Sequence, residues 1–126
     1  MVKFEPKKIL IVDDNTHEML TLSQILLTNG YQLCYAQNET LALTLARKTK
    51  PDLIICNTIG TKLDIMKLFD PVNAGTVTRR IPFLFIAESK EELQKCVGSR
   101  HSNSLIVKPF TREQLAITVQ EKLKKR

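Results

Sequence analysis

Four polar residues follow apolar segments of this sequence and are its first candidates for chemistry. Asp13 and Asp14 end one apolar run, Asn57 ends a second and Lys108 ends a third. Two adjacent carboxylates at the end of a buried strand cost free energy unless water, a partner or a cation compensates them. Mg²⁺ suits such oxygen ligands, and Lys108 can offset their charge or hold an anion. The alternative is that Asp13 and Asp14, with Asn15 and Thr16, cap the next helix and that Lys108 is a structural counter-ion.

The segments that must position these residues alternate between two kinds. Apolar runs predict strands at 8–12, 31–36, 53–56, 83–86 and 105–107. Helical periodicity predicts helices around 19–26, over 40–48, 63–72 and 91–97, and from residue 111 onward. In the second of these helices we expect Leu41 and Leu45 to face inward.

Strands that are apolar throughout and alternate with helices indicate a parallel sheet covered on both faces. Right-handed crossovers then produce an open α/β sandwich, whose ligands bind at the carboxyl ends of the strands. All four polar residues stand at such ends, and this favours one shared pocket over separate structural roles.

Four segments together resemble the response-regulator receiver domain, the CheY-like family. They are Ile9–Asn15, Pro51–Asn57, Ile81–Ile86 and Val107–Phe110, in order and at suitable distances over nearly the whole chain. The resemblance implies a flavodoxin-like α/β fold, with an open, doubly wound, five-stranded parallel sheet in the order 2-1-3-4-5 and five helices. It also implies that residues 1–126 form a single receiver domain.

The resemblance implies a phosphotransfer pocket. In active receivers an acid pair holds Mg²⁺, and an aspartate ending the third strand takes a phosphoryl group from a histidine kinase. A lysine contacts the phosphoryl oxygens, while a hydroxyl on the fourth strand and an aromatic ring on the fifth respond to the phosphate. The matching positions, in the same order, are Asp13 and Asp14, Asn57, Lys108, Ala87 and Leu105.

Three of these positions lack the side chain that the chemistry needs. The amide of Asn57 is a poor nucleophile and cannot form an acyl phosphate. It also removes an anionic ligand, so Asp13 and Asp14 are expected to form a weak Mg²⁺ site at most, with no cofactor required. Ala87 has no hydroxyl, for which Ser89 is the alternative source, and Leu105 has no aromatic ring. The sequence therefore predicts a degenerate receiver, or pseudo-receiver, with no catalytic residue.

The loop after the third strand also departs from the family. Thr61 stands where receivers commonly have proline, and Asp64 where they have glycine. This loop normally shapes the phosphorylation pocket, so its divergence agrees with the lost acceptor. In the remaining pocket we expect Lys108 to pair directly with Asp13 or Asp14.

These features predict a protein-interaction module of two-component, phosphorelay signal transduction that is not an enzyme and works without aspartyl phosphorylation. Its expected partner is a histidine kinase or another signalling protein, docked on the fourth helix, fifth strand and fifth helix. The alternative is an authentic phospho-accepting regulator, seen as an inactivated variant or as the receiver fragment of a longer protein. An Asp codon at position 57, or a downstream output domain, would favour that alternative.

Composition excludes several other classes. The chain carries a formal charge of +6 over 126 residues, but residues 9–121 hold equal numbers of basic and acidic side chains. The surplus lies at the two ends, and a basic tail at 122–126 suggests a nucleic-acid or membrane-surface binder as a third hypothesis. No DNA-reading element supports it, so we expect no specific nucleic-acid partner.

Apolar runs are too short for a membrane helix, and no secretory signal is recognisable at the start. The three cysteines form no zinc or paired pattern. Cys34 and Cys56 lie in apolar runs, so they are expected to be buried, reduced thiols of a cytoplasmic protein.

Overall fold

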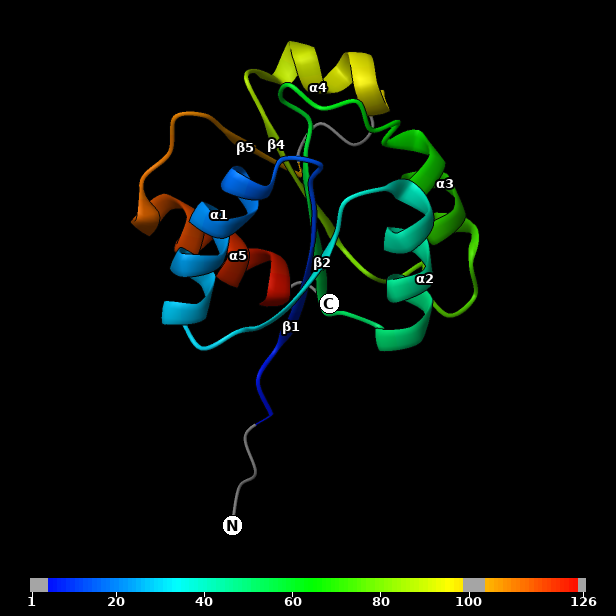
Figure 1. Ribbon diagram of the computed structural model, residues 1–126, viewed down its shortest axis with the longest axis horizontal. Helices are drawn as coiled ribbons and strands as arrows, with labels where there is room; N and C mark the ends of the chain where they lie inside the picture. Colours follow the sequence, from blue (N-terminus) through cyan, green and yellow to red (C-terminus); the bar gives the residue numbers. More distant parts are fainter. Residues whose placement is uncertain (1–4, 99–103, 125–126) are drawn as a thin grey trace.

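The computed structural model describes residues 5–98 and 104–124, in which strands and helices alternate (Figure 1). Two residues of the basic tail, 125 and 126, lie outside the described ranges. The strands are β1 (Lys8–Val12), β2 (Gln32–Ala36), β3 (Leu53–Asn57), β4 (Phe83–Ala87) and β5 (Leu105–Val107). The helices are α1 (Thr16–Thr28), α2 (Glu39–Thr49), α3 (Met66–Ala74), α4 (Lys90–Val97) and α5 (Arg112–Lys124).

The strands form one parallel sheet in the order β2-β1-β3-β4-β5, which confirms the predicted topology. Its register aligns Val12 of β1 with Cys56 of β3, and Cys56 with Phe85 of β4. The carboxyl ends of the three central strands therefore meet at one edge of the sheet, where the polar residues follow.

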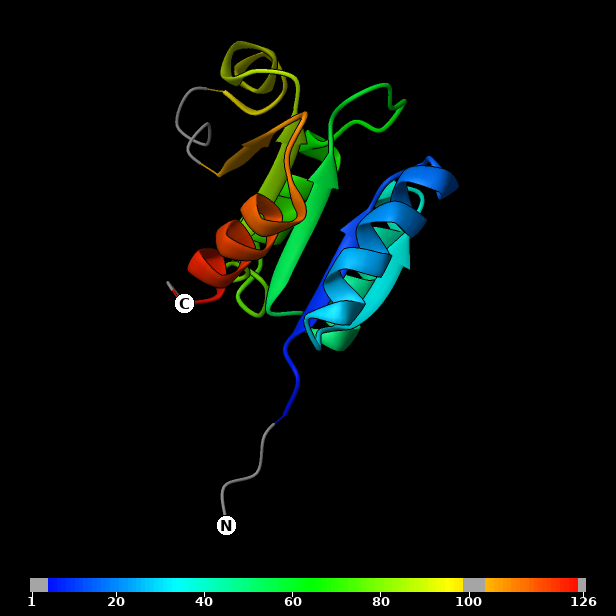
Figure 2. The ribbon, with the colours of Figure 1, turned by 90° about the vertical axis from the view of Figure 1, so that its left-hand side faces the viewer.

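Helices cover both faces of the sheet (Figure 2). One face packs against α1 and α5, and Leu26 and Leu115 are fully buried there. The other face packs against α2, α3 and α4, with a cluster in which the rings of Phe69 and Phe83 lie 4.9 Å apart, edge to face. Successive residues of a strand point to opposite faces, which explains why the central strands are apolar throughout.

Helix α2 corrects one prediction about the core. Leu41, expected to face inward, is 42% exposed, and Leu45 is half-buried. Ala42 and Ala46 are fully buried in their place. Small side chains let the helix backbone lie close to the sheet, so the rotation of α2 follows the alanines. Leu41 is left exposed, whereas Leu45 still packs against the core, as expected.

Helix α3 begins at Met66, three residues later than the predicted start at Leu63. The preceding loop is held by side chains of other elements. The amide of Lys62 donates to Asp14 at 2.9 Å, and the amide of Asp64 donates to Glu39 at 2.9 Å. These interactions hold the loop against the carboxyl edge of the sheet.

Among the described residues, no helix combines the length and the apolar composition needed to cross a membrane. The peptide bond between Lys108 and Pro109 is cis. Cys34 is half-buried, Cys56 is buried and Cys96 is exposed, and all three are free thiols. Of the two thiols that were expected to be buried, Cys56 is buried and Cys34 is half-buried.

Candidate functional site

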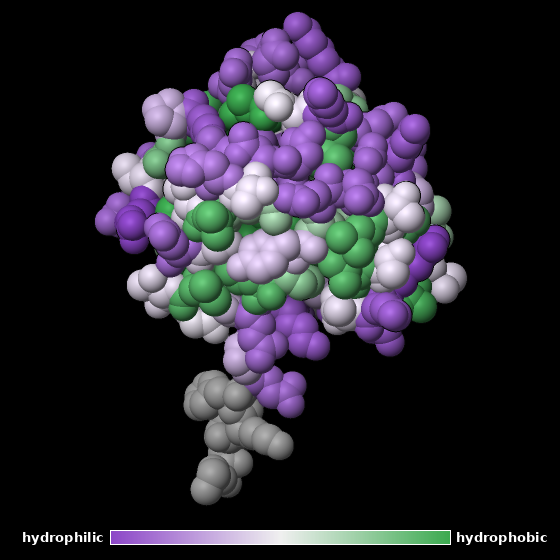
Figure 3. All heavy atoms as spheres, viewed as in Figure 1, coloured by the Kyte–Doolittle hydropathy of each residue, from purple (hydrophilic) through white to green (hydrophobic). Residues whose placement is uncertain are grey.

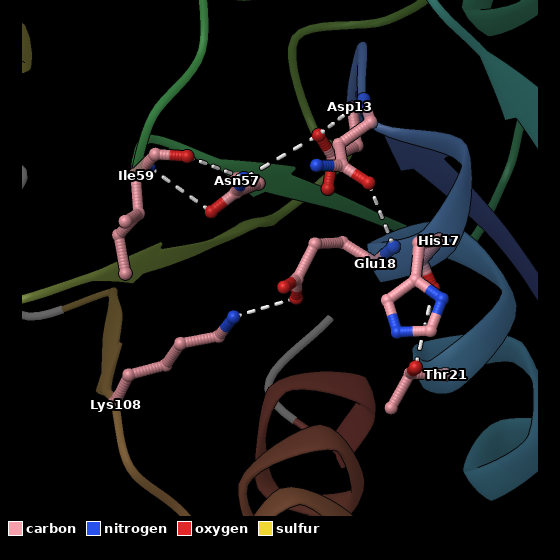
Figure 4. A network of polar contacts seen from close by, with 8 residues as sticks. Asp13, His17, Glu18, Thr21, Asn57, Ile59 and Lys108 are labelled. Carbon is pink, nitrogen blue, oxygen red and sulfur yellow. Dashed lines mark hydrogen bonds and ion pairs between the residues drawn. The ribbon is translucent and has the colours of Figure 1, made fainter.

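Asp13 lies at the carboxyl end of β1 and forms the floor of the site with Asn57 (Figure 4). Its backbone amide donates to the carbonyl of Ala36 at 3.1 Å, which continues the pairing of β1 with β2 for one residue. This backbone bond holds the residue in the sheet, and its side chain is only 4% exposed. A carboxylate is therefore placed in the interior by the strand that precedes it.

The Asn57 amide is engaged at both ends. Its Nδ2 donates to the carbonyl of Ile59 at 2.9 Å and to Oδ1 of Asp13 at 3.4 Å, and its Oδ1 accepts the Ile59 amide at 3.0 Å. Asn57 is 5% exposed. No buried side-chain nitrogen or oxygen in the described part of the chain lacks a hydrogen-bond partner. The polar groups of the floor thus find their hydrogen-bond partners within the chain itself.

Burial raises the pKa of the Asp13 carboxyl above its ordinary value. Hydrogen bonds from the Asn15 amide and the Asn57 side chain act in the opposite direction, because they stabilise the charged form. The nearby charges of Asp14 and Glu18 raise the pKa further. The net direction shows that desolvation outweighs the hydrogen bonds.

Asp14 leaves the sheet and belongs to the rim of the site. Its Oδ2 accepts the amide of Lys62 at 2.9 Å, and this bond lowers the pKa of the Asp14 carboxyl. The following residue, Asn15, caps α1 by accepting the amide of Glu18 at 3.1 Å. Of the residues named as possible caps, Asn15 caps α1, while the two acids take different structural roles.

Lys108 does not pair with either aspartate, so that prediction is wrong. Its Nζ lies 2.6 Å from Oε2 of Glu18, in the first turn of α1. The side chains of Lys108 and Glu18 are 32% and 40% exposed, so the pair keeps part of its hydration. Pairing with the buried carboxylate of Asp13 would cost the lysine more of its water.

Glu18 is the residue that the sequence reading missed. It follows Asp14 by four positions, about one helical turn, and therefore returns to the same end of the sheet. This spacing was a usable signal, although it does not distinguish Glu18 from the aspartates as the partner of Lys108.

The switch-equivalent positions lie at the strands that the resemblance indicated. Ala87 ends β4 and is fully buried, and its carbonyl accepts the Lys108 amide at 3.0 Å. Leu105 begins β5 opposite Phe85 and is half-buried. Ser89, the alternative hydroxyl, caps α4 by accepting the Glu92 amide at 3.1 Å. Its oxygen is therefore occupied outside the floor of the site.

A cavity of about 260 Å³ opens beside the floor, between α1 and the segment after β5. Asp13 and Asn57 supply its polar wall, and the Glu18–Lys108 pair lines it from the side. Leu22 and other apolar side chains complete the lining. The pocket keeps its place at the carboxyl edge but presents an amide where the family has an acid.

The donor set does not fit a tight Mg²⁺ site. The described residues contain no cluster of three or more His, Cys, Asp or Glu side chains that could hold a metal ion. The Asn57 Nδ2 group points at Oδ1 of Asp13, so a partial positive charge occupies the side of the carboxylate that faces Asn57. We therefore derive no chemical step through a metal ion.

A parallel sheet in this order, with acidic, amide and lysine side chains at its carboxyl edge, defines a receiver-like α/β protein. The sequence model of the response regulator receiver domain matches residues 9–120. The chain belongs to the response regulator receiver domain family.

Two curated relatives show how the similarity is distributed. The chain is 29% identical over 113 residues to protein PilH of Pseudomonas aeruginosa, covering 89% of this chain and 93% of PilH. It is 28% identical over 120 residues to the alkaline phosphatase synthesis transcriptional regulatory protein PhoP of Bacillus subtilis. That match covers 94% of this chain but only 49% of PhoP, so the chain spans about half of that regulator.

Among solved structures, the chain is similar to the chemotaxis response regulator CheY4 of Vibrio cholerae. The TM-score is 0.76 at 26% sequence identity, and the match covers 94% of this chain and 99% of CheY4. This similarity agrees with the topology and places the chain among receivers of two-component signalling.

Proposed function

We propose that this protein is a pseudo-receiver: a receiver-fold interaction module that works without aspartyl phosphorylation. The observation that carries the proposal is Asn57 at the end of β3, with its amide held by Ile59 and Asp13. An amide has no anionic oxygen to attack phosphorus, and this one uses both ends to bind its neighbours. The module has no enzymatic activity in this proposal.

The amide also supports a site that needs no metal. An aspartate at position 57 would place a second buried carboxylate beside Asp13, and two such charges require a cation or a proton. The Nδ2 group of Asn57 instead donates to Asp13, which satisfies the floor without Mg²⁺. Lys108, engaged with Glu18, is likewise held by a residue of the chain itself.

The partner in this proposal is a histidine kinase or another signalling protein that meets the module in the cytoplasm. We assign its docking to the face formed by α4, β5 and α5. Val107 of β5 is 42% exposed and Ile117 of α5 is 55% exposed, so this face offers apolar side chains to a partner. Conformational control by such a partner requires only that it bind one state of the module better than another.

The decisive experiment is incubation with acetyl phosphate and Mg²⁺, followed by intact-mass measurement. We expect no stoichiometric adduct of about 80 Da on the natural protein, because position 57 has no acceptor carboxylate. Asn57→Asp is the matched variant, since it restores an acceptor carboxylate at the end of β3.

An adduct on the natural protein that is lost at alkaline pH would contradict the proposal. An adduct on Asn57→Asp alone would support it and would show that Asn57 is sufficient to block phosphotransfer. If neither protein gains mass, the proposal also stands. The missing hydroxyl at Ala87, the pairing of Lys108 with Glu18 and the divergent β3–α3 loop then contribute to the block.

A further inference from the structure

The edge of the sheet at β2 carries apolar side chains that the receiver site does not use. Leu20 and Leu27 of α1 are 59% and 56% exposed, Tyr35 of β2 is 40% exposed and Leu41 of α2 is 42% exposed. We call these four residues the β2 face. Figure 3 shows hydrophobic side chains over α1 and α2 on either side of β2. Such a concentration marks an interaction surface.

The backbone of β2 is available along the same edge. The Gln32 amide donates to the Lys7 carbonyl at 2.9 Å, and the Ala36 carbonyl accepts from Asp13 at 3.1 Å. Alternate residues of a parallel strand bond to the same neighbour, so Gln32, Cys34 and Ala36 point their backbone groups toward β1. The amides and carbonyls of Leu33 and Tyr35 therefore point outward, away from the sheet.

The strand lacks the usual protection against pairing. Edge strands are commonly blocked by charged side chains, proline or bulges, and β2 reads Gln-Leu-Cys-Tyr-Ala. Because β2 itself carries no charged side chain, repulsion between like charges within the strand does not oppose its pairing with a second copy.

We propose that the β2 face joins two copies of this chain, with the two β2 strands antiparallel about a two-fold axis. Leu33 of each copy then pairs with Tyr35 of the other, and their outward backbone groups form the hydrogen bonds. The two five-stranded sheets become one continuous sheet. The leucines of α1 and α2 flank the junction on its two sides.

A second copy fits this face because its ends carry opposite charges. Lys7 and Lys8 lie at the amino end of β2, since Lys8 is aligned with Gln32. Asp14 and Glu39 lie toward the carboxyl end, after β1 and at the start of α2, where Lys62 and Lys67 offset part of their charge. Antiparallel pairing brings the basic end of one copy toward the acidic end of the other. The same patch is thereby complementary to itself, as a two-fold interface requires.

The test is the molar mass of the full chain in solution, measured across concentrations by sedimentation or by size exclusion with light scattering. We expect a dimer at high concentration. Leu20→Lys should weaken it by about tenfold or more, because it places a charge in the junction. Val77→Lys is the matched control, because Val77 is also 59% exposed but lies after α3, outside the β2 face.

A second variant tests the backbone pairing itself. Tyr35→Pro removes an outward amide that the isolated chain does not use in its sheet, so the fold should tolerate it. It should abolish dimerisation while circular dichroism still shows a folded protein. Leu20→Lys, on an exposed helix surface, answers the same question if Tyr35→Pro fails to fold.

Disulfide formation at Cys34 tests the register of the two β2 strands. In the proposed pairing it lies opposite Cys34 of the second copy, within the usual Cα separation for a disulfide. Diamide oxidises two thiols to one disulfide and takes up both protons and both electrons as it becomes a hydrazine. In a Cys96→Ser background, diamide should yield a covalent dimer that Cys34→Ser abolishes.

A protein that stays monomeric at all concentrations would overturn the proposal, as would retention of the dimer in both Leu20→Lys and Tyr35→Pro. A dimer lost only with Val107→Lys or Ile117→Lys would also overturn it, because that result assigns the interface to the α4–β5–α5 face. Loss with Leu20→Lys and Tyr35→Pro, but not with Val77→Lys, would support the β2 face.

Discussion

The floor and the rim of the receiver site use different means to stabilise acidic side chains. On the floor, Asp13 is 4% exposed and bonds to the Asn57 amide and the Asn15 backbone. On the rim, half-buried Asp14 bonds to the Lys62 amide, and Glu18 bonds to Lys108 at 2.6 Å. Two neighbouring aspartates thus have pKa values shifted in opposite directions, Asp13 upward and Asp14 downward.

The difference shows that the floor depends on neutralisation and the rim on solvation. A buried carboxylate cannot be screened by water, so its stability depends on which dipoles or charges face it. Rim carboxylates keep part of their hydration, so removing a partner costs less. Adding an uncompensated charge to the floor should therefore cost more free energy than removing a partner from the rim.

Asn57→Asp is expected to have the largest effect. Replacing Nδ2 by an oxygen removes the donor to Ile59 and Asp13 and places two carboxylates side by side. Without Mg²⁺ we expect a loss of about 3 kcal/mol in the free energy of unfolding, as for an uncompensated buried charge. Mg²⁺ should recover much of this loss, because it binds the folded state.

Urea unfolding with and without Mg²⁺ measures this effect, and the natural protein is the control. Its midpoint should respond little to Mg²⁺. An Asn57→Asp protein with the same stability and the same Mg²⁺ response as the natural protein would show that the floor is not organised by the Asn57 amide.

Asp14→Ala should cost about 1 kcal/mol at neutral pH, because the Lys62 amide loses a charged acceptor. The lowered pKa of Asp14 means that its contribution is present above the unfolded-state value of about 3.9 and is lost as pH falls through the folded value. The destabilisation by Asp14→Ala should therefore disappear in acid. Urea midpoints of the two proteins at neutral and acidic pH measure it.

Asp14→Asn is the control for that prediction, since its carbonyl can still accept the Lys62 amide. It should retain part of the stability at neutral pH. Equal losses in Asp14→Ala and Asp14→Asn would show that charge, and not the backbone hydrogen bond, stabilises this part of the rim.

Asp13→Asn should have a smaller effect, below about 1 kcal/mol, and the opposite pH dependence. The raised pKa of Asp13 means that the folded state binds its proton more tightly than the unfolded state, so ionisation reduces stability as pH rises. Asp13→Asn removes that penalty. Its free energy of unfolding, relative to that of the natural protein, should therefore be highest at neutral pH. Chemical unfolding of both proteins between pH 3 and 7 tests this pH dependence. A variant that is more stable, relative to the natural protein, in acid than at neutral pH would contradict it.

Lys108→Met should have the smallest effect, a loss of about 0.5 kcal/mol, because the pair with Glu18 is partly exposed. High salt should reduce the difference between Lys108→Met and the natural protein. Thermal unfolding at low and high salt measures it, with Lys95→Met as the control in the exposed pair with Glu92. A loss as large as that expected for Asn57→Asp would place Lys108 in the floor.

Local patterns in the sequence were sufficient to predict the sheet, its strand order through the family resemblance, and the strand ends at which Asp13, Asn57 and Lys108 lie. A sheet that is buried on both faces requires strands that are apolar throughout, and such strands can be recognised in the sequence alone. The loss of an acceptor carboxylate at Asn57 is equally local, because it depends on one functional group. These properties depend only on residue type and on spacing along the chain.

The tertiary structure alone decided which groups meet. Asp13, Asp14 and Glu18 all follow β1 at the carboxyl end of the sheet. Lys108 pairs with Glu18, while Asp13 is buried and Asp14 accepts the Lys62 amide. The rotation of α2, which buries Ala42 and exposes Leu41, depends on how closely a helix packs against the sheet. Both outcomes are set by competition between desolvation and packing across distant segments, and the spacing of residues along the chain does not determine which contact wins.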